Sequence, residues 1–180
     1  MTPERYDNAR YDDVPQDIKV LFERIPDTKR GIYIHGEVGT GKTHIAYALK
    51  QRYDSLGYHK MSVWNIPEIL NDMRADFDRP NSEKSRIEET IMASQRTAVF
   101  DDIGAEKITD WVAEKFYLII NDRYNRMMPT IFTSNLPIND LAERIGDRTT
   151  SRIVEMCDIV ELVGGDRRIT SKKPSIKVKL

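Results

Sequence analysis

Residues 36–43 read GEVGTGKT and match the pattern G-x-x-x-x-G-K-[ST] at each of its fixed positions. The apolar run GIYIH at residues 31–35 precedes this segment, and a helical pattern over residues 43–56 follows it. Between a strand and a helix, the glycines of such a loop let successive backbone N–H groups point at phosphate oxygens. The chain is therefore constrained to an α/β fold in which a strand leads directly into this loop. A chance glycine-rich turn is the alternative, and the flanking elements argue against it.

The loop predicts a nucleotide site. Lys42 is expected to reach the β- and γ-phosphates and the Thr43 hydroxyl to ligate Mg²⁺, while the helix dipole adds to the attraction for the anion. The predicted cofactors are therefore ATP and Mg²⁺. All eight residues of the loop are expected to contact them: Gly36, Glu37, Val38, Gly39, Thr40, Gly41, Lys42 and Thr43.

Two adjacent carboxylates, Asp101 and Asp102, end the apolar strand pattern at residues 97–102. A phosphate-binding loop needs a carboxylate for its metal from the end of a neighbouring strand. We expect Asp101 to hold Mg²⁺ through water and Asp102 to polarise the attacking water. Asn135 follows the next predicted strand, at 129–134, and its amide can accept from that water and donate to a phosphate oxygen. A solvated acidic turn and an ordinary Asn-Leu-Pro turn are the alternatives.

The composition is that of one globular domain. The chain has 180 residues, of which 39% are apolar and 32% charged, and its net charge of −1 does not mark a nucleic-acid binder. It has neither an apolar run of about 18 residues nor the apolar stretch of a secretory signal. We therefore expect a cytoplasmic protein without a membrane partner. The single cysteine, Cys157, excludes a disulfide framework, and we expect it to be buried in a reducing compartment.

Apolar runs alternate with helical patterns along the chain, as in a parallel α/β sheet. Residues 1–166 form the predicted core, in which residues 1–28 are a lead-in segment and a helix packed on it. Residues 167–180 are a tail with six basic residues and no acid, which could meet phosphate or be a solvated terminus. Further strands are expected at 58–64 and 158–163, and further helices from 65 onward and at 84–95, 110–125 (capped by Asp110), 138–145 and 148–157.

The motifs and their order carry a family resemblance. The loop is followed by DDIGAEKITDWVAEKFYLIINDRY, then by PTIFTSNLP, and then by DRTTSRIVEMCDIVELVGGDRR. This order resembles the AAA+ ATPases of the DnaC/DnaI/IstB group, which are bacterial and phage helicase loaders and transposition helper ATPases. The resemblance implies a P-loop NTPase fold, a three-layer αβα sandwich around a central, mostly parallel five-stranded sheet. It also implies that residues 36–43 are Walker A, Asp101 and Asp102 Walker B, and Asn135 sensor 1.

The resemblance further implies an arginine finger within residues 147–152, which would stabilise charge on the γ-phosphate bound by a neighbouring subunit. Arg152 is the first choice and Arg148 the second, and a surface arginine is the alternative. Arg167 or Arg168 could act as a sensor-2-like group. Loaders usually carry an N-terminal domain that grips the replicative helicase. This chain begins at the ATPase core, so a replicative helicase is a possible partner, but contact by that route is not expected.

The expected function is hydrolysis of ATP to ADP and phosphate, stimulated by self-association or DNA, in a helicase-loader-like protein of DNA replication. Basic side chains and one aromatic ring around a polar loop could contact single-stranded DNA, or could be ordinary surface residues: Arg74, Phe77, Arg79, Lys84 and Arg86. An IstB-like transposition helper is the alternative function. A small-molecule kinase is a third, but the adjacent aspartates and Asn135 favour water as the phosphoryl acceptor.

Overall fold

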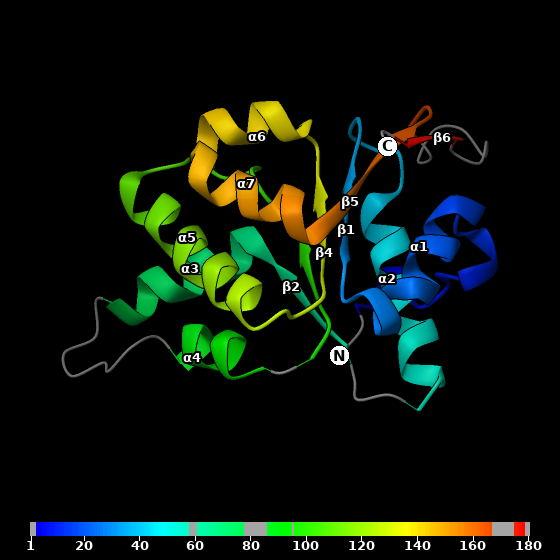
Figure 1. Cartoon of the computed structure of the whole chain (residues 1–180), viewed down its shortest axis with the longest axis horizontal. Helices are drawn as coiled ribbons and strands as arrows, with labels where there is room; N and C mark the ends of the chain where they lie inside the picture. Colours follow the sequence, from blue (N-terminus) through cyan, green and yellow to red (C-terminus); the bar gives the residue numbers. More distant parts are fainter. Residues whose placement is uncertain (1–2, 58–60, 78–85, 95, 167–174, 179–180) are drawn as a thin grey trace.

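The structure is a computed structural model, and it describes residues 3–57, 61–77, 86–94, 96–166 and 175–178. A central sheet has helices on both faces, as Figure 1 shows. No helix within the described part of the chain is long and apolar enough to cross a membrane. The strands are β1 (Gly31–His35), β2 (Ser62–Asn65), β3 (Ala98–Asp101), β4 (Thr130–Ser134), β5 (Cys157–Val163) and β6 (Ser175–Val178). The helices are α1 (Gln16–Thr28), α2 (Lys42–Ser55), α3 (Ile66–Phe77), α4 (Arg86–Ala93), α5 (Asp110–Asn125), α6 (Ile138–Ile145) and α7 (Asp147–Met156), with the 3-10 turns η1 (Glu4–Tyr6) and η2 (Tyr11–Asp13) before them.

The sheet order is β2-β3-β4-β1-β5-β6. The first five strands are parallel, and β6 pairs antiparallel with β5, with Leu162 opposite Ile176. The sheet thus has six strands instead of the expected five. Four residues of a basic tail carry too weak a pattern to predict a strand, and β6 forms because β5 would otherwise present an unpaired edge.

Strand side chains alternate between two cores, one on each face of the sheet. In β1, Ile32 and Ile34 belong to the core beneath α1 and α2, and Tyr33 belongs to the core beneath α3, α5, α6 and α7. The two helical layers lie on opposite sides of the sheet in Figure 1. Parallel strands buried on both faces present their functional groups at the carboxyl edge of the sheet.

The predicted elements and the observed ones agree closely. Helix α5 has the expected bounds, and α2 lies within one residue of its prediction at either end. The cap of α5 was predicted wrongly, because the side chain of Thr109, instead of Asp110, accepts a hydrogen bond from the Val112 N–H at 3.4 Å. Thr109 has extended backbone, as a capping residue needs, and Asp110 is already helical.

Cys157 is the first residue of β5, where a helix was expected to end. Its side chain is 1% exposed, and its Sγ lies 3.5 Å from the Thr130 carbonyl oxygen of β4. Burial raises the pKa of the Cys157 thiol far above its usual range. The residue is therefore an unreactive part of the sheet core.

Candidate active site

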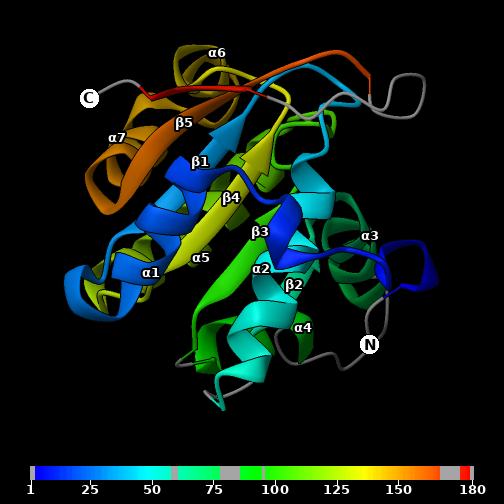
Figure 2. The same cartoon turned by 90° about the vertical axis from the view of Figure 1, so that its right-hand side faces the viewer.

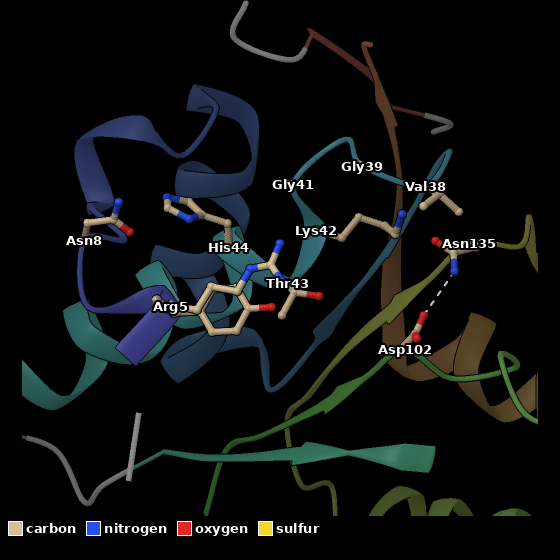
Figure 3. A pocket seen from close by; sticks show the side chains of 11 residues that line it. Arg5, Asn8, Val38, Gly39, Gly41, Lys42, Thr43, His44, Asp102 and Asn135 are labelled. Carbon is tan, nitrogen blue, oxygen red and sulfur yellow. Dashed lines mark hydrogen bonds between the residues drawn. The ribbon is translucent and has the colours of Figure 1, made fainter. Parts of the chain in front are cut away.

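The predicted residues of the loop, the acidic pair Asp101–Asp102 and Asn135 meet where β1, β3 and β4 end. These strands are parallel neighbours, so the segments after them meet at one edge of the sheet. A cavity of about 380 Å³ opens there. Figure 3 shows most of its lining side chains, which come from the P-loop, α2, the ends of β3 and β4 and the lead-in segment: Arg5, Tyr6, Asn8, Val38, Gly39, Gly41, Lys42, Thr43, His44, Asp102 and Asn135.

Two glycines let the loop pack closely against β5 and against Asp166, which follows that strand. A Cβ added at Gly36 would lie 2.2 Å from the Leu162 carbonyl oxygen, so the loop leaves β1 directly against β5. Gly39 has a φ of +84°, and a Cβ there would lie 2.3 Å from the carboxyl carbon of Asp166. Side chains at either position would force the loop away from its neighbours.

Lys42 lies inside the loop. Its Nζ donates hydrogen bonds to the carbonyl oxygens of Gly36 and Glu37, both at 2.8 Å, and the residue is 6% exposed. Burial lowers the pKa of Lys42 to about 8, although the carboxylates of Asp102 and Asp101 oppose the shift. The ammonium is thus a desolvated cation fixed where a phosphate chain wrapped by the loop would meet it.

Thr43 and Asp101 form a pair of oxygen ligands suited to Mg²⁺. The Thr43 hydroxyl donates to Asp101 Oδ2 at 3.2 Å, and the Thr133 hydroxyl donates to Asp101 Oδ1 at 2.6 Å. Burial raises the pKa of the Asp101 carboxyl, and hydrogen bonds from Thr133, Thr43 and Asn65 oppose that rise. No cluster of three or more His, Cys, Asp or Glu suited to a metal occurs among the described residues. Mg²⁺ in such a site takes its other ligands from phosphate and water.

Asp102 and Asn135 lie together at one end of the cavity. The Asn135 Nδ2 donates to Asp102 Oδ1 at 3.1 Å, as Figure 3 shows. Asp102 has a φ of +64°, in the left-handed region that Asp tolerates better than most residues. Its backbone N–H donates to the Thr133 hydroxyl at 2.9 Å, which fixes the turn that presents the carboxylate. A carboxylate beside an amide can orient one water and polarise it.

The turn after Asp102 is tied to β4 and α6. The Ser134 hydroxyl donates to the Ile103 carbonyl oxygen at 2.7 Å, and Arg144 of α6 donates to the Gly104 carbonyl oxygen at 2.8 Å. The Gly104 N–H donates to Glu106 Oε1 at 3.3 Å, and burial raises the pKa of the Glu106 carboxyl. These contacts hold the Asp102 carboxylate in one place relative to the neighbouring strand.

Sequence reasoning missed several residues of the site. Thr133 supports both aspartates and Asn65 contacts Asp101, but threonine and asparagine at strand ends carry no distinctive signal. The lead-in segment contributes Arg5 and Asn8 to the cavity wall, through tertiary packing that no local pattern reveals. His44, the residue after the loop, also lines the cavity.

Arg148 and Arg152 do not line the cavity of their own chain. Both lie on α7 over the ring of Tyr117 in α5, with guanidinium carbons 4.6 and 5.2 Å from its centroid. Arg152 Nε also donates to Asn121 Oδ1 at 2.9 Å, and its Nη1 donates to the Arg148 carbonyl oxygen at 2.8 Å. We call these four residues, Arg148, Arg152, Tyr117 and Asn121, the arginine face.

Several predicted residues are not described at the side-chain level. Arg79, Lys84, Arg167 and Arg168 lie outside the described residues, and so do the side chains of Phe77 and Arg86. Arg74, the remaining candidate for single-stranded DNA, has its guanidinium carbon 5.5 Å from the centroid of the Trp111 ring. Its contact is therefore with the chain's own α5.

The model of the family described as IstB-like ATP binding protein matches residues 17–175. The chain belongs to this family. The predicted family relationship is thereby confirmed, and with it a P-loop ATP-binding fold of the AAA+ type.

Relatives of two kinds match the chain. The replicative helicase loader DnaI of Bacillus subtilis is 26% identical over 154 residues, which are 77% of this chain and 48% of that protein. The ATP-binding protein of insertion sequence IS5376 of Geobacillus stearothermophilus is 26% identical over 153 residues, 82% of this chain and 59% of that protein. The chain spans about half the length of these curated relatives.

A solved structure supports the fold. The crystal structure of the DnaC helicase loader superposes with a TM-score of 0.75 at 27% sequence identity, over 87% of this chain and 98% of that one. The mostly parallel sheet with helices on both faces is thus the AAA+ arrangement, with the sixth strand as the difference from the prediction.

Proposed function

We propose that the protein hydrolyses ATP to ADP and phosphate, and that it acts in DNA replication as a helicase-loader-like ATPase on single-stranded DNA. The observation that carries the hydrolytic part is the Asp102–Asn135 contact at 3.1 Å, in one cavity with Lys42 and Thr43. The loader part is supported by the likeness to the loader DnaI and to the DnaC structure.

Binding rests on the loop residues. The backbone N–H groups of residues 36–43 and the Lys42 ammonium would hold the β- and γ-phosphates. Thr43 and Asp101 would hold Mg²⁺, which when bound neutralises charge between the β- and γ-phosphates. The hydrogen bonds from Thr43 and Thr133 keep the Asp101 carboxylate oriented for that role.

Hydrolysis rests on Asp102 and Asn135. The Asp102 carboxylate would accept a hydrogen bond from the attacking water, and Asn135 would hold that water against the γ-phosphate. As the water oxygen bonds to the γ-phosphorus, the bond from that phosphorus to the β,γ-bridging oxygen breaks. ADP leaves, and the second product is inorganic phosphate.

The arginine face supports a site shared between copies of the chain. Arg152, or Arg148 as the alternative, would reach the γ-phosphate bound by a neighbouring subunit and stabilise its developing charge. The support is that both guanidinium groups lie outside the cavity of their own chain, and that Arg148 is exposed and Arg152 half-buried. Single-stranded DNA would gather subunits and complete such sites.

The test is phosphate release per subunit, measured across protein concentration with no DNA, with single-stranded DNA and with duplex DNA. We expect turnover to rise with concentration, and more steeply with single-stranded DNA. Asp102→Asn is the control for contaminating ATPase. Turnover that is independent of concentration and of DNA would contradict the assembly, and absence of hydrolysis would contradict the chemistry.

A transposition helper is the second candidate, because the family match and the IS5376 relative favour it. Such a protein would respond to duplex DNA more than to single strands, so the same assay separates the two. Phosphate transfer to a small acceptor in place of water would identify a kinase. Co-purification of partner proteins with the full chain, with ATP bound, would then test whether a replicative helicase is a partner.

A further inference from the structure

The lead-in segment is fixed to the helix that follows the P-loop. The ring of Tyr6 in η1 stacks on Tyr47 of α2, with centroids 4.5 Å apart and planes at 10°. Gln51 of α2 also donates from its Nε2 to the Tyr6 carbonyl oxygen at 3.2 Å. Figure 2 shows the segment passing across α2. Since α2 begins at Lys42, η1 has a defined position relative to the P-loop.

Arg5 extends from η1 into the cavity. It is one of the lining residues, together with Lys42 and Thr43. In Figure 3 its side chain points to the Thr43 side of the cavity, and Asp102 and Asn135 lie at the other end. Across the part of the chain that the structure describes, no hydrogen bond or ion pair engages its guanidinium.

A guanidinium that has no partner among the described residues, held at the mouth of a phosphate-binding loop, is suited to bind phosphate. Its planar fork of donors matches two phosphate oxygens. The loop N–H groups and Lys42 approach a phosphate chain from one side. Arg5 approaches from the side of the lead-in segment, so a bound phosphate chain would lie between the loop and Arg5.

We propose that Arg5 binds the phosphate chain of the nucleotide in the same subunit, at the part that ATP and ADP share. Arg5 lies on the Thr43 side of the cavity, away from Asp102 and Asn135. It would therefore contact the phosphate chain away from the γ-phosphate, which is where water attacks. This inference rests on the proposed nucleotide site. It makes Arg5 a binding residue, distinct from an arginine finger, which acts on the transition state.

The experiment is calorimetry of ATP, ADP and GTP on the full chain and on Arg5→Ala, with the thermal midpoint as the check on folding. We expect affinity for all three nucleotides to fall about tenfold, with turnover at saturating ATP within about twofold of the parent. Arg5→Lys should restore part of the affinity, because it keeps the charge without the fork. Arg10→Ala, an exposed lead-in arginine outside the cavity lining, is the matched control.

Each other outcome overturns the proposal in a recognisable way. A loss confined to ATP would place Arg5 at the γ-phosphate, and a change in the ATP-to-GTP ratio would place it at the base. Unchanged affinities in Arg5→Ala would remove the contact altogether. A parent chain that binds ATP without hydrolysing it would contradict the proposed function alone, while a tenfold loss in Arg5→Ala would still support this contact.

Discussion

The P-loop end of the cavity and the arginine face are built in opposite ways. At the cavity, Lys42, Asp101 and Thr133 are buried. Lys42 donates to carbonyl oxygens of the loop, and Thr133 donates to the Asp101 carboxylate. On the arginine face, Arg148 is exposed, and both arginines rest on the ring of Tyr117. The first region is organised within one chain, whereas the second has cations held at the surface by contacts that a competing ligand can replace.

The difference indicates a division of labour. Groups that bind and position charge benefit from burial, because interactions between charges strengthen as water is excluded. Groups that act on another molecule must remain reachable, and stacking on an aromatic ring orients a guanidinium without burying it. The four predictions that follow test this division, beginning with the largest expected effect.

Lys42→Ala should abolish measurable ATP binding, because it removes the buried cation of the loop. Lys50→Ala is the matched control, since Lys50 lies on the same helix, pairs with Asp54 and does not line the cavity. Calorimetry with ATP and Mg²⁺ measures both. Parental binding by Lys42→Ala would show that the cavity end is not the nucleotide site and would remove the basis of the comparison.

Arg152→Ala should bind ATP normally but hydrolyse it about 10³-fold more slowly, because the finger contributes only in the transition state. Mixing Arg152→Ala subunits with Lys42→Ala subunits should restore part of the turnover, since one supplies the cavity and the other the arginine. Arg24→Ala, an exposed arginine on α1, is the control. No restoration in the mixture would mean that the arginine face does not serve a second copy.

Asp102→Asn should retain ATP binding and reduce turnover about 10²-fold, because the amide cannot take a proton from water. Asn also tolerates the positive φ at this position and keeps an oxygen for the Asn135 contact. Asp101→Asn should in addition weaken Mg²⁺-dependent binding. Phosphate release and calorimetry on both variants, with the exposed Asp110→Asn as control, separate the two roles; parental turnover in Asp102→Asn would move the base elsewhere.

ATP affinity should fall about tenfold between pH 7 and pH 9, because the pKa of Lys42 is near 8 and the neutral amine binds phosphate poorly. Raising pH removes the proton that binding requires, so affinity decreases in that direction. In Asp102→Asn, which lacks a carboxylate that raises the Lys42 pKa, the decline should begin at lower pH. A flat affinity profile would show that the buried lysine does not titrate in this range.

The sequence predicted those parts of the site that depend on local patterns. The loop at 36–43 and the strand ends with Asp101, Asp102 and Asn135 were recognisable because each motif follows an apolar run. Parallel strand order then brings them to one edge, as the structure shows. The sequence did not show which of these side chains contact one another. It indicated only that a phosphate-binding loop needs carboxylates and an amide nearby.

The remaining parts depend on contacts between distant segments. Arg5 reaches the cavity because Tyr6 stacks on Tyr47, and the local sequence around either tyrosine does not predict that contact. Strand β6 forms by pairing with β5, so its register follows from tertiary structure. Thr133 is recognisable as a supporting residue only once β3 and β4 are known to be neighbours.

The burial of Cys157 has a practical consequence for labelling. The chain has one cysteine, and its thiol is fully covered within the sheet, so a maleimide should leave the folded protein unmodified. A variant such as Arg148→Cys would then carry a single reactive thiol without removal of the native one. A fluorophore attached there would report its distance from a fluorescent nucleotide held by another copy, and so follow assembly on DNA as it occurs.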